Sequence, residues 1–120
     1  MRICIDLDGT ICKNKLPGQS YADLEPIPGA VEALKKLKEQ GHYIIISTAR
    51  HMKTCNNNVG LVVAKQGKTL LDWLEKYKIK YDEIHFGKIL ATVYIDDHAI
   101  KFKNWDHTIE ELLQVEDHLK

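Results

Sequence analysis

Short, mostly apolar runs alternate along the chain with longer stretches in which apolar residues recur at helical spacing. Four runs are too short for a helix, and each is followed by a glycine or a polar residue. They lie at residues 3–5, 43–46, 83–86 and 92–95. Runs with such boundaries are typical of buried β-strands, so we expect four strands.

Three stretches show the period of an amphipathic helix. The first lies between Pro28 and Gly41, which are residue types common at a helix start and a helix end. The second is centred on residues 70–77. In the third, Thr108 and Glu111 have the spacing of a capping box. Strands alternating with helices predict an α/β fold, a three-layer sandwich with a central parallel sheet of the Rossmann type.

Chemically reactive side chains follow each predicted strand. In open α/β sheets ligands bind at the carboxyl ends of the strands, so we expect these side chains at one edge. They are carboxylates after the first and last strands, with a hydroxyl, a guanidinium and an amine after the others. The residues are Asp6, Asp8, Thr48, Arg50, Lys88, Asp96 and Asp97.

The four aspartates predict a divalent cation. Carboxylates brought together without a cation would repel one another. Mg²⁺ prefers oxygen ligands, and it would offset the charge with which a phosphate dianion repels a nucleophile. We therefore predict Mg²⁺ as the cofactor, with Asp6, Asp8, Asp96 and Asp97 as candidate ligands.

The same set of residues predicts phosphoryl transfer. Asp6 could attack phosphorus and form an aspartyl-phosphate. Asp8 leans the same way in an extended chain, so it could protonate the leaving oxygen and later deprotonate a water. Thr48 could donate a hydrogen bond to the phosphoryl oxygens, and Lys88 could place a positive charge against them.

The turn after the first strand predicts main-chain contacts to the phosphate. Gly9 permits a sharp turn, and nearby amide groups can bind phosphate oxygens. Leu7, Gly9 and Thr10 are therefore candidates for substrate binding, together with Arg50. An arginine at a strand end equally often pairs with a carboxylate, so both roles stay open for Arg50.

Residues 6–10, Asp-Leu-Asp-Gly-Thr, resemble the first motif of the haloacid dehalogenase (HAD) superfamily. Thr48, Lys88 and the pair Asp96-Asp97 resemble its second, third and fourth motifs. The motifs occur in the family's order, each at a predicted strand end, and they span most of the chain. The resemblance implies a HAD-like fold.

The resemblance also implies a role for each matching residue. Asp6 would be the nucleophile and a Mg²⁺ ligand. Asp8 would be the general acid and base, and would bind Mg²⁺ through its backbone carbonyl. Thr48 and Lys88 would hold the phosphate.

The fourth motif would complete the metal site. Asp96 would be a further ligand, with Asp97 as a second one, directly or through a water. One departure from the family pattern follows the third motif, where Lys88 precedes Ile89 and many relatives have proline. This departure concerns the local backbone more than the role of the lysine.

Members of the superfamily often carry a cap domain after the first or the second motif. Residues 12–25 are too few for one, and the 39 residues between Thr48 and Lys88 already hold a loop, a helix and a strand. We therefore predict a capless, single HAD-like domain over residues 1–120. Its site should be open unless the 51–66 loop or a second subunit covers it, which leaves a homo-oligomer as an alternative.

Within the superfamily, several strings resemble small capsule polysaccharide biosynthesis phosphatases. They lie at residues 45–50, 81–88 and 94–100. This narrower resemblance would imply a sugar phosphate as substrate.

Composition narrows the classes of partner. Seventeen basic residues balance seventeen acidic ones, so the net charge gives no reason to expect nucleic acid or an anionic membrane. No apolar stretch reaches the length of a membrane span. Three cysteines without regular spacing argue against a disulfide framework and favour a cytoplasmic location. We expect a small phosphorylated substrate as the partner, with neither nucleic acid nor membrane.

Other activities are compatible with some of these residues. A phosphotransferase or mutase could pass the phosphoryl group from Asp6 to an acceptor other than water. A receiver domain in signalling also places Asp, Thr and Lys around Mg²⁺, but its acidic pair comes first in the chain, whereas Asp96 and Asp97 come last here. The intact set of Asp6, Asp8, Lys88 and Asp96 disfavours a non-catalytic binding protein.

Overall fold

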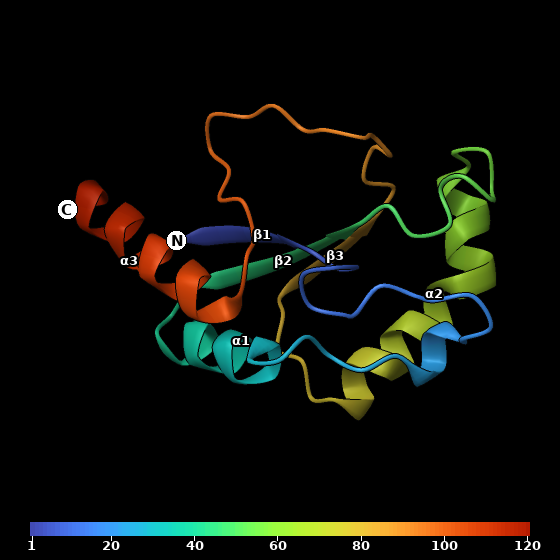
Figure 1. Cartoon of the computed structure of the whole chain (residues 1–120), viewed down its shortest axis with the longest axis horizontal. Helices are drawn as coiled ribbons and strands as arrows, with labels where there is room; N and C mark the ends of the chain where they lie inside the picture. Colours follow the sequence, from blue (N-terminus) through green and yellow to red (C-terminus); the bar gives the residue numbers. More distant parts are fainter.

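The computed structural model describes all 120 residues and contains three strands, three α-helices and one 3₁₀ helix. In chain order these are β1 (Arg2–Asp6), η1 (Tyr21–Asp23), α1 (Ala30–Glu39), β2 (Tyr43–Thr48), α2 (Val59–Lys76), β3 (Glu83–Phe86) and α3 (Trp105–Leu119). The strands form one parallel sheet in the order β1-β2-β3, and in the view of Figure 1 the three α-helices lie below the sheet and towards its two ends. The predicted α/β fold with a central parallel sheet and no cap domain is confirmed.

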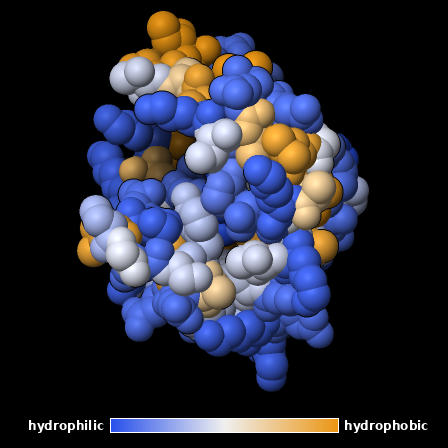
Figure 2. Space-filling model, turned by 90° about the vertical axis from the view of Figure 1, so that its right-hand side faces the viewer, coloured by the Kyte–Doolittle hydropathy of each residue, from blue (hydrophilic) through white to orange (hydrophobic).

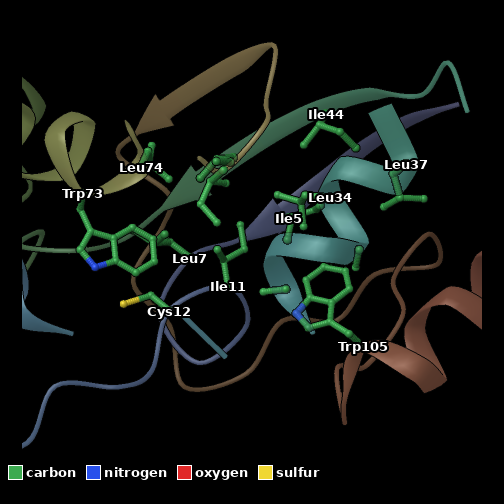
Figure 3. Packing of buried hydrophobic residues seen from close by; sticks show 14 of the residues in the cluster. Ile5, Leu7, Ile11, Cys12, Leu34, Leu37, Ile44, Trp73, Leu74 and Trp105 are labelled. Carbon is green, nitrogen blue, oxygen red and sulfur yellow. The ribbon is translucent and has the colours of Figure 1, made fainter. Parts of the chain in front are cut away.

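The alternation of side chains along β1 and β2 places the hydrophobic core on one face of the sheet. Ile5 is the partner of Ile46 in the parallel register, and Ile3 is the partner of Ile44. Successive side chains of a strand point to opposite faces, so these four share a face, and Figure 3 shows Ile5 beside helix α1. Ile5, Ile44 and Ile46 belong to a core of 17 buried residues, whereas Cys4, on the other face, is exposed.

The second helix begins earlier than its apolar spacing indicates. Asn58 is its N-cap, with the side-chain oxygen accepting a hydrogen bond from the amide of Leu61 at 3.0 Å. Helix α2 therefore starts at Val59 and takes in residues that the sequence places in the 51–66 loop. An asparagine cap inside an asparagine-rich segment is hard to distinguish by type alone, because asparagine is common in both caps and turns.

The predicted capping box of the last helix is wrong. Helix α3 begins at Trp105, and Asn104 caps it by accepting a hydrogen bond from the amide of His107 at 2.8 Å. Thr108 lies within the helix, where its hydroxyl donates to the carbonyl of Asn104 at 3.0 Å. The cap nearer the start of the helix satisfies the free amides, so Thr108 is not needed for that role.

The predicted fourth strand at residues 92–95 is not formed. These residues belong to the segment 89–103, called the arch below, which leaves the carboxyl edge of the sheet and returns to α3 (Figure 1). Only residues 87–91 separate β3 from the predicted strand. Neighbouring parallel strands need a connection of roughly a dozen residues or more, so this one is too short. The sheet therefore has three strands, not four.

Candidate active site

The turn after β1 presents its two aspartates at the carboxyl edge of the sheet. Leu7 is fully buried, and its carbonyl accepts hydrogen bonds from the amides of Thr10, Ile11 and Cys12 at 3.2, 2.9 and 2.9 Å. Gly9 has φ 83°, a left-handed conformation that favours glycine, and its amide donates to the Cys12 carbonyl at 2.7 Å. The turn is therefore tightly closed around Leu7.

This closure bears on the predicted main-chain contacts. The amides of Gly9 and Thr10 donate within the turn, to Cys12 and Leu7 respectively. In this conformation they are engaged, so a phosphate would compete with the turn for them. The role of these amides in binding a substrate stays a prediction.

Asp8 is held by a buried arginine. Arg50 donates from Nε to Asp8 Oδ2 at 3.1 Å and from Nη2 to Oδ1 at 2.7 Å, and Arg50 is only 7% exposed. The guanidinium carbon also lies 4.2 Å from the ring centroid of Tyr21. A bidentate pair of this kind fixes the direction of the carboxylate. Of the two roles open for Arg50, the structure therefore shows the ion pair with a carboxylate.

Thr48 supports Arg50 from the end of β2. Its hydroxyl oxygen accepts a hydrogen bond from the Arg50 amide at 3.0 Å, and the residue is 1% exposed. The side chain is buried beneath the surface of the site and does not line the cleft. Contact between Thr48 and a phosphate stays a prediction.

Lys88 lies against Asp6. Its ammonium nitrogen is 3.3 Å from Asp6 Oδ1, and its amide donates to the carbonyl of Thr48 at 3.0 Å. The preceding Gly87 has φ 96°, and a Cβ there would lie 2.8 Å from Val59 Cγ2, which is closer than such contacts allow. Glycine at this position thus lets the chain turn beside α2 and direct Lys88 toward Asp6.

A cleft of about 390 Å³ opens at this edge, and Asp6, Asp8, Arg50 and Lys88 line it. Figure 2 views this side of the molecule, where the strands end. Further lining residues come from positions for which the sequence offers no motif; they are Tyr21, Ala49, His51, Lys53, Thr54, Leu90 and Tyr94. None of this set is identified from the sequence.

Two lining residues have shifted pKa values. Burial, together with the positive charge of Arg50, lowers the pKa of His51, which keeps its imidazole neutral near pH 7. Burial and the negative charge of Asp8 raise the pKa of Tyr21, so its phenol stays protonated. The full charges in the cleft are therefore the carboxylates of Asp6 and Asp8 and the cations Arg50, Lys53 and Lys88. Three cations against two carboxylates leave a positive balance, which suits an anionic substrate.

The second acidic pair lies away from this cleft. Asp96 accepts a hydrogen bond from the amide of His98 at 2.7 Å, and Asp97 lies 3.7 Å from the ring of the same histidine. The side chain of Asp97 is 91% exposed. His98 therefore contacts the acidic pair and not the cleft. The structure brings Asp6 and Asp8 together with Arg50 and Lys88, and leaves Asp96 and Asp97 outside.

The chain by itself fits a Mg²⁺ site only in part. Asp6 and Asp8 offer oxygen atoms of the kind Mg²⁺ prefers. However, the Asp8 carboxylate is already paired with Arg50, and no group of three or more His, Cys, Asp or Glu side chains is placed to hold a metal ion. The assignment of Asp96 and Asp97 as ligands stays a prediction.

Comparisons with known proteins agree with the fold and the motifs. The sequence model of a family described as haloacid dehalogenase-like hydrolase matches residues 3–89. A crystal structure of a target protein from Vibrio cholerae matches 99% of this chain and 98% of its own, with 31% sequence identity and a TM-score of 0.82. A search of curated proteins found no match.

A more distant crystal structure shares the fold. It is a D,D-heptose 1.7-bisphosphate phosphatase from B. bronchiseptica, complexed with magnesium and phosphate. The identity is 14% and the TM-score is 0.51, over 97% of this chain and 63% of that one. Separately, none of the helices in the present structure has the length and apolar character needed to cross a membrane.

Proposed function

The chain belongs to the haloacid dehalogenase-like hydrolases, and from this premise we propose that it is a Mg²⁺-dependent phosphatase that acts through an aspartyl-phosphate on Asp6. The observation that carries the proposal is the placement of Asp6, Asp8, Arg50 and Lys88 around one cleft at the carboxyl edge of the sheet. The substrate would be a small phosphorylated metabolite, part of which would lie in the cleft of about 390 Å³.

In the first step, a carboxylate oxygen of Asp6 attacks phosphorus while the bond to the leaving oxygen breaks. Lys88, 3.3 Å from Asp6, is placed to stabilise the charge on the phosphoryl oxygens and to orient the nucleophile. Bound Mg²⁺ would offset the charge of the phosphate dianion, with the carboxylate of Asp6 and the backbone carbonyl of Asp8 as the residues that would hold it.

Asp8 carries the proton in both halves of the reaction. It donates a proton to the leaving oxygen, and it then takes one from the water that attacks the phosphoryl-aspartate and releases inorganic phosphate. In the structure both oxygens of Asp8 accept hydrogen bonds from Arg50, so Asp8 has to release one of these bonds when it carries the proton. The atoms balance, because one water is consumed and Asp6 is regenerated.

The identity of the substrate is a narrower part of the proposal. A sugar phosphate of capsule or cell-surface polysaccharide synthesis is favoured by the resemblance of residues 45–50, 81–88 and 94–100. A cytoplasmic location agrees with three cysteines that form no disulfide. A panel of phosphorylated sugars, nucleotides and amino acids would identify the class, and adding an alcohol acceptor would separate hydrolysis from transfer.

The test of the function is hydrolysis of p-nitrophenyl phosphate with and without Mg²⁺. We expect activity that EDTA abolishes and that Asp6→Asn lowers by at least about 10³-fold, because the amide cannot attack phosphorus. Asp23→Asn, an exposed aspartate in η1, is the matched control and should retain activity. Undiminished turnover in Asp6→Asn would contradict the proposal.

A further inference from the structure

We propose that the active site is shared between two copies of the chain, each adding its segment 92–97 as a strand to the free edge of β1 in the other. The exchange places Asp96 of the partner subunit beside Asp6. The pairing of segment and strand is argued from geometry alone. Only the catalytic consequence rests on the proposed function.

The arch has the properties of a segment without its partner. No residue of the arch forms a backbone–backbone hydrogen bond. Ile89, Val93 and Ile95 are 74%, 69% and 98% exposed. Figure 2 shows hydrophobic side chains gathered at the top of the molecule, at the height that the arch has in Figure 1. Contiguous apolar surface of this kind marks an interaction site.

The free edge of β1 matches this segment. β1 pairs only with β2, so the main-chain groups of its outer edge have no strand partner. An unpaired edge is a template for another strand, which main-chain hydrogen bonds then hold. Residues 92–95, Thr-Val-Tyr-Ile, are β-branched or aromatic, the residue types that favour strands. A parallel register that sets Asp96 level with Asp6 also sets Tyr94 level with Cys4, and Thr92 level with Arg2.

The chain cannot make this pairing with itself. The Lys88 amide is bonded to the carbonyl of Thr48, the last residue of β2. Arg2 is level with Tyr43, five residues before Thr48. From Thr48 to a strand outside β1, level with Arg2, the path is therefore about 10 Å across and about 16 Å back along the sheet, or about 19 Å in a straight line. The four residue steps from Lys88 to Thr92 reach at most about 14 Å. An antiparallel strand would carry Asp96 to the opposite end of β1.

A second copy removes this limit. Its segment approaches the edge from outside, with no crossover connection to span. The exchange is also reciprocal, because each copy offers the same edge and the same segment, as in a two-fold symmetric dimer. In this state Tyr94 leaves its present contacts, a hydrogen bond to the carbonyl of Ile89 and a position 4.5 Å from the Lys88 ammonium.

The exchange accounts for the incomplete metal site of the single chain. One copy supplies Asp6 and Asp8 with no third carboxylate, and its own Asp96 and Asp97 are turned to solvent. Placing Asp96 and Asp97 of the partner subunit beside Asp6 and Asp8 gives the oxygen-rich surroundings that Mg²⁺ prefers.

The first test uses complementation between two inactive variants. Asp6→Asn and the double variant Asp96→Asn/Asp97→Asn are each unfolded, mixed in equal amounts and refolded together. Half of the dimers then contain one chain of each variant. In such a dimer one site has Asp6 together with the partner's Asp96 and the partner's Asp97, and the other site lacks all three carboxylates. The expected result is about a quarter of wild-type activity. If every site is built from one chain, the mixture stays inactive, and the proposal is overturned.

The second test needs no activity. Tyr94→Cys is oxidised with diamide, and native Cys4, which is exposed, is the expected partner, whereas Cys12 and Cys55 are buried. We expect a covalent dimer on a non-reducing gel that Cys4→Ser abolishes. Leu119→Cys, at a more exposed position at the end of α3, is the control and should give no Cys4-dependent dimer.

The two tests separate the failure of this proposal from failure of the proposed function. A Cys4-dependent dimer in a protein without phosphatase activity would support the exchange and contradict the function. An active protein that is monomeric by light scattering and gives no such dimer would overturn the exchange and leave the function standing.

Discussion

The carboxyl edge of β1 to β3 and the arch carry the same kinds of residue, yet only one of them is built into the fold. At the edge, Asp8 has two hydrogen bonds from Arg50, and Asp6 lies against Lys88. In the arch, Asp96 bonds only to a nearby backbone amide and Ile95 is almost fully exposed. The difference teaches that a strand-like pattern becomes a strand only where the chain can reach a partner strand.

The contrast is clearest between two isoleucines in similar apolar runs. Ile46, in β2, has strands on both sides and is fully buried, whereas Ile95 has no strand beside it. Both are preceded by residue types that favour strands. The environment that each finds in three dimensions, and not the local pattern, separates them.

This pair offers the prediction with the largest effect on stability. Ile46→Ala should lower the free energy of unfolding by about 2–5 kcal/mol, because it leaves a cavity in the core. Ile95→Ala should change it by less than about 0.5 kcal/mol at concentrations where the chain is monomeric. Urea denaturation of both variants measures the difference, and equal losses would contradict the description of the arch as unpacked.

A second prediction concerns the cation at the built edge. Lys88→Ala should lower kcat by about 10²-fold or more, because the charge placed beside Asp6 is lost. Lys65→Ala, on an exposed position of α2, is the control and should leave kcat unchanged. Steady-state kinetics with p-nitrophenyl phosphate measures both variants. A wild-type rate in Lys88→Ala would show that the ion pair has no part in turnover.

The smallest effect concerns the thiols. Burial raises the pKa of Cys12 to about 11, the neighbouring Arg50 opposing this in part, whereas Cys4 is exposed. At pH 8, a thiol reagent should therefore label Cys4 in the folded protein and Cys12 only after unfolding, as peptide mass spectrometry would show. Rapid labelling of Cys12 in the native state would mean that the turn after β1 opens readily.

The same pKa has a consequence for stability. Folding keeps the Cys12 thiol protonated above the ordinary pKa of 9.0. The contribution of this thiol to the free energy of unfolding is therefore complete below pH 9.0 and declines as the pH rises toward 11. Cys12→Ala should make the loss of thermal stability over this range less steep. An identical pH dependence in the variant would contradict the assignment.

Much of the fold is predictable because it depends on local pattern. Residues 3–5, 43–46 and 83–86 form strands as expected, since the connections between them, residues 7–42 and 49–82, are long enough to return the chain to the sheet. The run at 92–95 has a similar pattern but a connection of only five residues, and a pattern of apolar residues does not include this limit. The cap of α3 does not follow from residue type, because Asn104 and Thr108 are both good caps.

The site divides in the same way. Motif spacing was sufficient to bring Asp6, Asp8 and Lys88 to one cleft, because each directly follows a strand or its turn. It could not show that Arg50 would pair with Asp8, since either role suits an arginine at a strand end. Tyr21 lies in η1 and other cleft residues come from loops, where side-chain position depends on tertiary packing and has no periodic signal.

The central claim, that Asp6 is the phosphoryl acceptor, is tested most directly by trapping the intermediate. Asp8→Asn should slow hydrolysis of the intermediate, so an acid quench during turnover of p-nitrophenyl phosphate should capture a phosphoenzyme. Borohydride reduction converts a phosphorylated aspartate to homoserine, which peptide mass spectrometry can locate. The account predicts homoserine at position 6 alone. Homoserine at another aspartate, or turnover without any trapped phosphoenzyme, would contradict it.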